Sequence, residues 1–479
     1  MRGCADEHTP ALLFEVCVAK KAEPNVKDAR RIAFDVLTRV DEGGYSDLVL
    51  DAALEANPGL DPRDRALATE LVYGVLRRRG NLDFILKAYS RQPLKKLQPK
   101  VLRLLRLGIY QLCYLDRIPD RAVVHSMVEL ARRCGLERVS GLVNGVLRSY
   151  LREPNRVVWP DPRRDTQGWL EHGLSLPHWL AQRWLVQYGA EGAMALAESQ
   201  LSAPPVTVRV NTLKMTRNAF VAQLKQRDIA AEPTRFAPEG VVLPHAGDLQ
   251  RLPGREEGWY QVQDEASMLI AHLLSVEPGQ RLLDGCAAPG GKTTHLAALT
   301  DNRSEILALD LHSQRLEILQ QGAKRLGCQQ IRTLACDMTQ PCEDLSAGGF
   351  DRVLIDAPCS GLGVLRRNPE SRWRRKQTDI KVLAKTQRQI LHQAAELVVP
   401  GGLLLYSLCT TTPEESTAVV ADFLAHHPMY VQVNLANRVP KHWEGLFDDD
   451  GQLVTRTGEH GPMDCFFAAG FYRQPECSF

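Results

Sequence analysis

The sequence has no paired cysteine motif. Its 479 residues include twelve cysteines, but no two of them have the Cys-x-x-Cys spacing of zinc ribbons and thiol oxidoreductases. No group of His, Cys, Asp and Glu has the spacing of metal ligands along the chain either, so we expect no metal. A chain of this length does not need a disulfide framework, and we therefore expect reduced thiols in a cytoplasmic protein.

Long apolar runs are also absent. No apolar stretch reaches the roughly 20 residues that a membrane-spanning helix needs, so no membrane partner is expected. The short apolar stretch at residues 11–19 is interrupted by Glu15 and preceded by only one basic residue, Arg2. This pattern is not typical of a secretory signal. We expect residues 1–26 to be a disordered tail.

The chain as a whole has almost no excess of positive or negative charge. The net charge is +2, with 24% charged and 44% hydrophobic residues, which is the composition of an ordinary globular protein. Affinity for a nucleic acid would therefore have to come from local patches. The length predicts more than one domain.

Residues 27–153 have the pattern of an all-helical domain. Ile32, Val36, Leu37 and Val40 recur at intervals of three and four residues. Glycines and prolines separate this repeat from later ones. Within the domain, residues 77–106 hold ten Lys and Arg against one Asp. Such asymmetry suits binding to a phosphate backbone, and a solvated helix face is the alternative.

The remaining chain divides into three parts. Residues 154–203 are predicted to be a helical linker, and residues 204–258 a small α+β module. Residues 259–473 alternate between strand and helix patterns, which predicts an α/β Rossmann-like domain with a parallel sheet and helices on both faces. Ligands of such domains bind at the carboxyl ends of the strands. The expected strands are 281–284, 305–310, 331–336, 351–356, 402–408 and 465–471.

A Gly-rich turn at residues 283–292, Leu-Asp-Gly-Cys-Ala-Ala-Pro-Gly-Gly-Lys, joins the first of these strands to a helix. A turn of this kind exposes backbone N–H groups to an anionic or nucleotide-like ligand. A phosphate-binding Walker A loop would need glycine at Cys286. A dinucleotide fingerprint would have to accept Ala287 as its middle glycine. The third interpretation is a loop that binds S-adenosylmethionine.

Acidic residues follow successive strands. Asp284 ends the first expected strand, Asp310 ends the second, and Asp337 follows the third. Asp310 could accept both hydroxyls of a ribose, and Asp337 could accept the amino group of an adenine. A single Asp in such a place is usually a helix cap, but three of them after a Gly-rich loop favour a nucleoside-containing cofactor.

Two cysteines are expected at neighbouring strand ends. Cys359 follows Asp356-Ala-Pro, and Cys409 follows Tyr406-Ser-Leu. One such cysteine is usually a small core residue, but two beside one pocket suit nucleophilic catalysis. A thiolate that adds to carbon 6 of cytosine would activate carbon 5 for methylation. Asp356 near ring nitrogen 3 would stabilise the adduct, and the base would have to leave its helix.

Three segments resemble the RNA-binding NusB-like helical domain. They are residues 29–37, residues 64–77 and the run Gly-Leu-Val-Asn-Gly-Val-Leu-Arg at 141–148. The resemblance covers most of residues 28–153. It implies that this domain binds RNA.

Residues 204–472 resemble the RNA 5-methylcytosine methyltransferases of the NOL/NOP/Sun type. The matching motifs are residues 283–293, residues 356–361 and residues 406–415. The resemblance implies that Cys409 is the attacking nucleophile and that Cys359 assists proton removal or product release. It also implies a pocket for S-adenosylmethionine and the base, made by Cys286, Ala287, Ala288, Pro289, Gly290, Gly291, Lys292, Asp310, Asp337 and Asp356.

Taken together, the two resemblances imply a methyltransferase that forms 5-methylcytosine in small-subunit ribosomal RNA. We expect a monomer and no DNA partner, although the sequence does not give the oligomeric state. Three positions depart from the family pattern. Leu408 replaces a usual Thr, Gly285 replaces an apolar residue, and Cys465 replaces a usual Gly. Leu408 could alter the placement of the nucleophile.

A second basic segment, residues 366–376, surrounds Trp373. Its composition suits contact with an RNA backbone and stacking on a base, and a solvated helix start is the alternative. Three other functions remain open at this point: a transfer-RNA cytosine-5 methyltransferase, a non-catalytic RNA-binding assembly or antitermination factor, and a nucleotide-dependent dehydrogenase.

Overall fold

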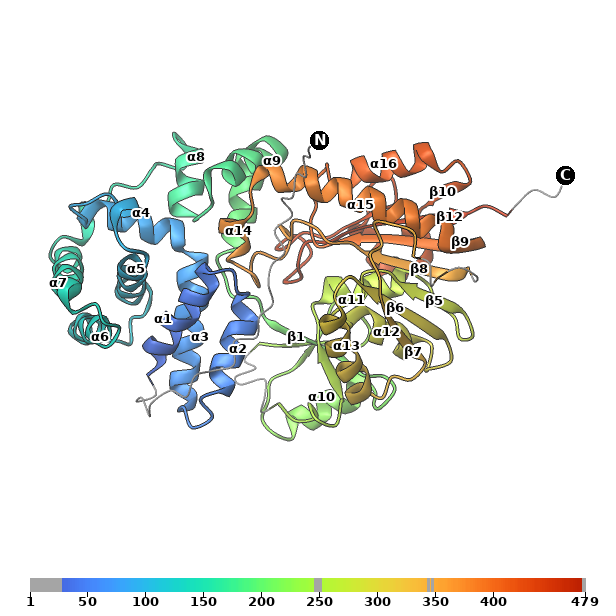
Figure 1. Cartoon of the computed structure of the whole chain (residues 1–479), viewed down its shortest axis with the longest axis horizontal. Helices are drawn as coiled ribbons and strands as arrows, with labels where there is room; N and C mark the ends of the chain where they lie inside the picture. Colours follow the sequence, from blue (N-terminus) through green and yellow to red (C-terminus); the bar gives the residue numbers. More distant parts are fainter. Residues whose placement is uncertain (1–27, 245–251, 343–344, 346–348, 476–479) are drawn as a thin grey trace, which may run out of the picture.

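The computed structural model describes residues 28–244, 252–342, 345 and 349–475, so the expected tail at 1–26 lies outside the described residues. A group of helices occupies one end of the molecule and a large sheet the other (Figure 1). Between them lie the helix α9 and, below it, the small module around β1. No helix in the described ranges is long and apolar enough to cross a membrane.

The N-terminal domain is all-helical, as predicted, and one apolar core runs through it. Asp61 caps α3 by accepting a hydrogen bond from Arg63 N, and Pro62 occupies the first turn. The helices are α1 (Ala29–Asp41), α2 (Ser46–Glu55), α3 (Pro62–Arg77), α4 (Arg79–Tyr89), α5 (Pro99–Tyr114), α6 (Asp120–Arg133) and α7 (Glu137–Arg152).

Helices continue into the linker. The short α8 (Thr166–Gly168) is followed by a π-helical turn (Trp169–Gly173) and by α9 (His178–Ser199). Helix α9 kinks at Gly189, whose φ is 69°. Its side chains reach the catalytic domain, because Arg183 pairs with Glu414.

The small module is a four-stranded antiparallel sheet in the order β2-β3-β1-β4, with one helix. Its elements are β1 (Val206–Val210), α10 (Arg217–Lys225), β2 (Glu232–Pro233), β3 (Gly240–Leu243) and β4 (Tyr260–Val262). Since β4 pairs with β1, the small sheet reaches beyond residue 258.

The catalytic sheet is mixed, with strand order β10-β12-β9-β8-β5-β6-β7 and β11 beside β12. The strands are β5 (Arg281–Asp284), β6 (Glu305–Asp310), β7 (Ile331–Ala335), β8 (Phe350–Asp356), β9 (Val398–Leu408), β10 (Tyr430–Val433), β11 (Leu453–Val454) and β12 (Phe467–Arg473). The expectation of a wholly parallel sheet is wrong at one edge, because β12 runs antiparallel to β9 and to β10. A return strand that follows a loop rather than a crossover helix can pair in this direction.

Helices cover both faces of this sheet, as expected (Figure 1). One core contains residues of α11 and α12 and the side chains of Leu282 and Leu354. The other contains residues of α15 and α16 and the alternate side chains Leu283 and Val353. The helices are α11 (Glu265–Leu273), α12 (Gly291–Leu299), α13 (Ser313–Leu326), α14 (Ser371–Arg374), α15 (Gln377–Leu397) and α16 (Thr417–His426).

The second basic segment holds the domains together instead of facing solvent. Arg372 is fully buried and donates hydrogen bonds to the carbonyls of Arg77, Ser175, Gln200 and Leu365. Burial lowers the pKa of Arg372 to about 9. The prediction that this residue contacts RNA is wrong, because the backbone carbonyls of three parts of the chain use its donors.

Its neighbours are used in the same way. Trp373 Nε1 donates to Leu76 O, and Arg374 donates to the carbonyls of Val40 and Gly44 in the helical domain. The indole N–H and the guanidinium are thus used in contacts with the helical domain. In this segment only Lys376 is exposed.

The first basic stretch, 77–106, divides into buried and exposed parts. Arg103 pairs with Asp41 and Arg106 with Asp83, and both arginines are buried. The exposed cations are Lys87, Arg91, Lys95, Lys96 and Lys100. These five are the exposed cations of the stretch, whereas Arg78 and Arg79 are half-buried.

Candidate active site

The predicted site residues meet at the carboxyl edge of the catalytic sheet. Across this edge the strand order is β9, β8, β5, β6, β7. Asp356 on β8 is in register with Ser407 on β9, two residues before Cys409. Asp284 on β5 is in register with Leu354 on β8. The two cysteines therefore lie on one side of the Gly-rich loop, and Asp310 and Asp337 on the other.

The Gly-rich loop is held against the neighbouring strand. Ala287 N donates to Leu309 O at 2.7 Å, and Gly290 N donates to Ala287 O at 2.8 Å. Gly290 has a φ of 99°, which favours glycine, and helix α12 begins at the next residue. No side chain caps α12, so its first N–H groups remain available to a ligand.

Gly285, one of the departures from the family pattern, has a steric reason here. A Cβ atom at this position would lie 2.5 Å from Ile355 Cδ1 on β8. The neighbouring strand thus fills the space that an apolar side chain would take.

Asp310 and Asp337 lie at the ends expected of them, but their surroundings differ. Asp310 is buried, accepts from His312 N, and lies 3.4 Å from Arg315 Nη1. Asp337 is exposed and accepts from Thr339 N and Oγ1, so it stabilises its own turn. The buried carboxylate at the end of β6 is the better placed of the two to hold a ribose.

Lys292 and Asp356 join the cofactor loop to the cysteine-bearing strands. Lys292 Nζ donates to Asp356 Oδ2 at 2.7 Å. The other oxygen of Asp356 accepts from Ser407 Oγ at 2.7 Å. Lys292 Nζ also lies 5.2 Å from the centre of the Phe466 ring. Both Asp356 oxygens are therefore fixed by hydrogen bonds, one from each side of the site.

The two cysteines are direct neighbours. The Sγ atoms of Cys359 and Cys409 lie 3.2 Å apart, and both side chains are half-buried. The hydrogen bond with Cys409, followed by burial, raises the pKa of Cys359 well above its ordinary value. Cys359 is thus held as a neutral thiol, and either sulfur can donate to the other.

Glu415 ties the two cysteine segments together, a role that sequence reasoning did not find. Its buried carboxylate accepts from Ser360 N at 2.8 Å, from Gln387 Nε2 at 3.0 Å and from Thr412 Oγ1 at 2.6 Å. Tyr406 Oη donates to its carbonyl. The sequence places Glu415 in the motif at 413–415, which is a signal of a role. It does not show which groups Glu415 contacts.

Two further groups fix the same segments. Arg375 donates to the carbonyls of Cys359 and Ser360, although it was predicted to contact RNA. Gly363 N donates to Cys409 O, and Gly363 O accepts from Cys465 N. A Cβ atom at Gly363 would lie 2.0 Å from Cys465 O, so only glycine fits between the backbone at Cys409 and the backbone at Cys465.

The other two departures are buried structural positions. Leu408 is fully buried in the apolar core. Cys465 is buried, and its sulfur accepts from Thr457 N. Neither departure therefore removes a functional group from the site at the carboxyl edge of the sheet.

Burial also perturbs an acid beneath the cofactor loop. Asp284 is buried and accepts from Thr293 Oγ1 at 2.7 Å. Burial raises the pKa of Asp284 to about 7, and the Thr293 hydrogen bond opposes the shift. This carboxyl group therefore changes its charge close to neutral pH.

Among the described residues, two groups of side chains have the chemistry of metal ligands: Glu239 with His272 and His295, and His392 with Asp422 and His426. Glu239 of the small module lies 3.1 Å from His272 Nε2 and 2.8 Å from His295 Nε2. The interaction with His295 is the chief cause that lowers the pKa of Glu239, against the effect of burial. Glu239, His272 and His295 hold the small module against α11 and α12.

Comparison with known proteins places the domains of this chain in known families. Residues 271–472 match the 16S rRNA methyltransferase RsmB/F family. Residues 27–152 match the NusB family, and residues 176–250 match the ferredoxin-like domain of RsmF/B-like methyltransferases. A "Probable ribosomal RNA small subunit methyltransferase B" from Bacillus subtilis is 38% identical over 416 residues, which are 86% of this chain and 92% of that protein.

The chain belongs to the 16S rRNA methyltransferase RsmB/F family. The ribosomal RNA small subunit methyltransferase B of Pseudomonas putida is 36% identical over 84% of this chain and 89% of its own length. The crystal structure of PH0851 superposes with a TM-score of 0.80 at 25% identity, covering 92% of this chain and 98% of that one. The resemblance identified from the sequence is confirmed.

Membership in the RsmB/F family makes the chain an S-adenosylmethionine-dependent rRNA methyltransferase with three domains: NusB-like, ferredoxin-like and methyltransferase. The residues present fit this cofactor. The uncapped start of α12 can accept its carboxylate, and the buried Asp310 on the adjacent strand can accept its ribose hydroxyls.

Proposed function

We propose that this RsmB/F family member methylates carbon 5 of a cytosine in 16S rRNA through a covalent adduct on Cys409. The observation that carries the proposal is the pair of sulfur atoms 3.2 Å apart at the rim of the sheet, beside Asp356 and the cofactor loop. Two thiols in one pocket suit a reaction in which one attacks the base and the other handles a proton.

The proposed roles follow from the contacts of each group. S-adenosylmethionine, when bound, supplies the methyl group. Cys409 adds to carbon 6 of the extruded cytosine, which makes carbon 5 nucleophilic. Cys359, with its raised pKa, is the neutral partner that donates to Cys409 before attack. After methylation the carbon-5 proton leaves to solvent, the carbon 5–carbon 6 double bond re-forms, and the carbon 6–sulfur bond breaks so that Cys409 leaves as a thiolate, with the Cys359 S–H donating a hydrogen bond to the departing sulfur.

Asp356 is proposed to face ring nitrogen 3 of the cytosine. Its carboxylate is held by Lys292 on one side and Ser407 on the other, so it needs little reorganisation during the reaction. Residues 286–292 and Asp310 are proposed to hold the cofactor, and Asp337 to face its adenine. For Asp337 this role requires release of its bonds to Thr339.

We propose cytosine 967 of the small-subunit RNA as the target. We also propose that a single chain suffices for catalysis, since every group named above comes from one sheet. A cytoplasmic location is proposed because ribosomal RNA is the substrate and the thiol pair needs a reducing compartment.

The test uses labelled S-adenosylmethionine and small-subunit RNA with three proteins: wild type, Cys409→Ser and Cys359→Ser. Cys342→Ser is the matched control, since Cys342 is another half-buried free cysteine of the same domain. Transfer RNA is offered in parallel. We expect wild type and the control to label carbon 5 of one cytosine, and Cys409→Ser to lose activity by several orders of magnitude. Cys359→Ser is expected to accumulate a protein–RNA adduct that survives denaturing gels.

Each contrary result selects another function. Labelling of transfer RNA alone would mean a transfer-RNA methyltransferase. RNA binding by a wild type that transfers no methyl would mean a non-catalytic assembly factor. An active Cys409→Ser would remove the covalent mechanism.

A further inference from the structure

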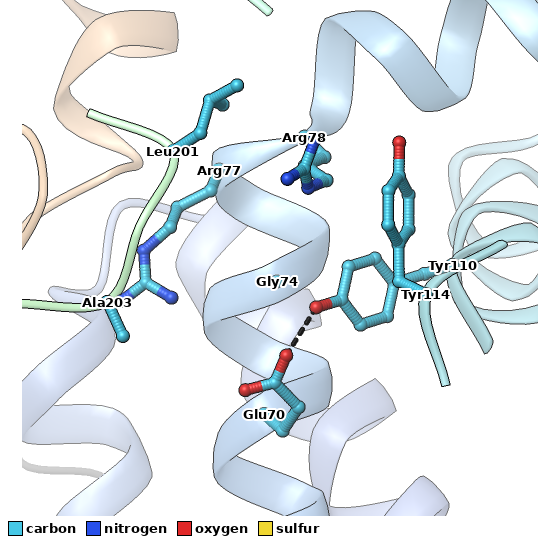
Figure 2. A pocket seen from close by; sticks show the side chains of 8 residues that line it. All are labelled: Glu70, Gly74, Arg77, Arg78, Tyr110, Tyr114, Leu201 and Ala203. Carbon is cyan, nitrogen blue, oxygen red and sulfur yellow. Dashed lines mark hydrogen bonds between the residues drawn. The ribbon is translucent and has the colours of Figure 1, made fainter. Parts of the chain in front are cut away.

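A small cavity lies between the NusB-like domain and the segment that enters the small module (Figure 2). Its volume is about 240 Å³, below the range typical of sites for drug-sized ligands. The lining residues are Glu70, Gly74, Arg77, Arg78, Tyr110, Tyr114, Leu201 and Ala203. None of these residues belongs to the active site described above.

Two tyrosines and an arginine give this cavity its chemistry. The guanidinium carbon of Arg78 lies 4.3 Å from the centre of the Tyr114 ring. The Tyr110 and Tyr114 rings have centres 5.2 Å apart and are tilted by 33°. Among the described residues no carboxylate forms an ion pair with Arg78, so its charge is available to a ligand.

The aromatic groups are fixed in place. Tyr114 Oη donates to Asn81 Oδ1 at 2.5 Å, and Tyr110 Oη donates to Glu70 Oε1. A Cβ atom at Gly74 would lie 2.0 Å from Tyr110 Cζ, so the missing side chain lets the ring pack against α3. Figure 2 shows Tyr110 directed across α3 toward Glu70, with Arg78 at the top of the same helix.

A guanidinium beside aromatic rings is the combination that binds single-stranded nucleic acid, because bases stack on such faces and the cation pairs with phosphate. The cavity is too small for a helix but has room for one base and part of its sugar. We propose that it binds one unpaired nucleotide of the RNA substrate, with the base on the Arg78 guanidinium that covers the Tyr114 ring and the phosphate on an N–H group of the same guanidinium. This inference rests on the proposed rRNA function.

The cavity is also connected to the catalytic domain. Arg77, on its wall, donates to Arg366 O. Arg366 in turn donates to Ala203 O on the opposite wall and to Pro462 O in the catalytic domain. A nucleotide held here is therefore placed relative to the domain that carries the cysteines, which would orient the RNA for delivery of its target base.

The experiment compares Arg78→Gln and Tyr114→Leu with Arg156→Gln in the full chain. Arg156 of the linker is the matched control, because its guanidinium carbon lies 5.7 Å from the centre of the Tyr89 ring of the helical domain, outside the cavity. Methylation kinetics, binding of a single-stranded fragment of the substrate RNA at several salt concentrations, and thermal unfolding are measured. We expect about a tenfold higher KM for RNA in both cavity variants, with kcat and cofactor affinity unchanged.

The salt dependence separates the two contacts. Loss of one phosphate contact in Arg78→Gln should reduce the slope of log K against log salt by about 0.7, whereas Tyr114→Leu should leave the slope unchanged. RNA binding equal to wild type in both variants, with unchanged thermal unfolding, would overturn the proposal.

A variant that fills the cavity with a larger side chain tests the proposal even if Arg78→Gln and Tyr114→Leu disturb folding. Ala203→Trp would block the cavity from its exposed edge, and Ser202→Trp is its control at the exposed neighbouring position outside the lining. We expect only Ala203→Trp to weaken RNA binding, and equal binding by both would overturn the proposal. Binding and methyl transfer are separate readouts, so a wild type that binds RNA without methylating it counts against the proposed function and not against the cavity.

Discussion

The Sγ atoms of Cys359 and Cys409 lie 3.2 Å apart, although the two residues are on different strand ends. A disulfide bond is about 2.05 Å long, so a small movement would join the sulfurs. We expect a mild thiol oxidant to remove two electrons and two protons from the pair, close the bond and abolish activity, with recovery after a reducing agent.

Peptide mapping by mass spectrometry checks this expectation, since the linked peptides would lose two hydrogens together. The same mapping must find Cys328 unlinked, as it lies away from the rim beside Thr294 O. Inactivation without a 359–409 link would contradict the prediction.

The Lys292–Asp356 ion pair joins the cofactor loop to the strand of the first cysteine. Lys292→Met would leave a half-buried carboxylate without its cation, and breaking a buried pair is costly. We expect at least a tenfold loss of kcat/KM, measured by methyl transfer, and weaker cofactor binding, measured by calorimetry. The control is Lys324→Met in the last turn of α13. Values within twofold of wild type would show that the pair is dispensable.

Glu415 acts as a positioning residue, because it contacts both cysteine segments without facing the pocket. The Glu415 carboxylate accepts from three donors: Ser360 N, Gln387 Nε2 and Thr412 Oγ1. In Glu415→Gln the amide NH₂, itself a donor, would face one of them, and that hydrogen bond would be lost. We expect kcat to fall by about tenfold or more with KM for RNA unchanged, and the free energy of unfolding to fall by about 1–3 kcal/mol.

Glu414→Gln provides the comparison at the adjacent position. Its carboxylate is half-exposed and pairs with Arg183, so a smaller effect is expected. If Glu415→Gln instead raised KM alone, Glu415 would act on RNA binding and not on cysteine placement.

Arg372 satisfies four backbone carbonyls from three parts of the chain. Its replacement by Met leaves these buried acceptors unpaired, at about 1–3 kcal/mol for each that water cannot reach. We expect a lower free energy of unfolding and faster proteolysis within residues 154–203. Lys376→Met, an exposed change in the same segment, should leave both measurements near wild type. Unaltered proteolysis of Arg372→Met would mean that the helical domain docks without this residue.

The buried Asp284 predicts a pH dependence of stability. Its pKa rises from 3.8 in the unfolded chain to about 7 in the fold, because burial disfavours the ionised form. Between these values only the unfolded chain is ionised, so stability falls as pH rises and levels off above about pH 7, with a total change of about 4 kcal/mol.

Asp284→Asn removes this titration and keeps an acceptor for Thr293. We expect the variant to gain stability relative to wild type as pH increases from 5 to 8, measured by denaturant unfolding. Glu317→Gln, at an exposed site on α13, should show no such trend. A constant difference between Asp284→Asn and wild type would contradict the prediction.

Much of the catalytic sheet was predictable, because strand and helix alternate with clear periods and the cysteine motifs follow apolar strands. The antiparallel β12 was not, since a strand pattern carries no direction. The prediction that the basic segment around Trp373 contacts RNA was wrong for a related reason. A sequence shows that Arg372 and Arg374 are charged, but not that unpaired carbonyls of another domain lie beside them.

The same limit applies to contacts between distant parts of the chain. Glu239, His272 and His295 come from two domains and meet only in the fold. Glu415 belongs to a motif visible in the sequence, yet its bond to Ser360 N depends on the pairing of β8 with β9.

Arg209 extends from the ferredoxin-like module to α12, the helix proposed to bind the cofactor. This buried side chain on β1 donates to Gly291 O and to Thr294 Oγ1, in the first turn of α12. A shortened enzyme, whether engineered or naturally truncated, that begins after the small module would lose the support beneath its cofactor loop. The smallest fragment expected to bind S-adenosylmethionine with full affinity therefore starts before residue 206, so the module and the catalytic domain form one working unit.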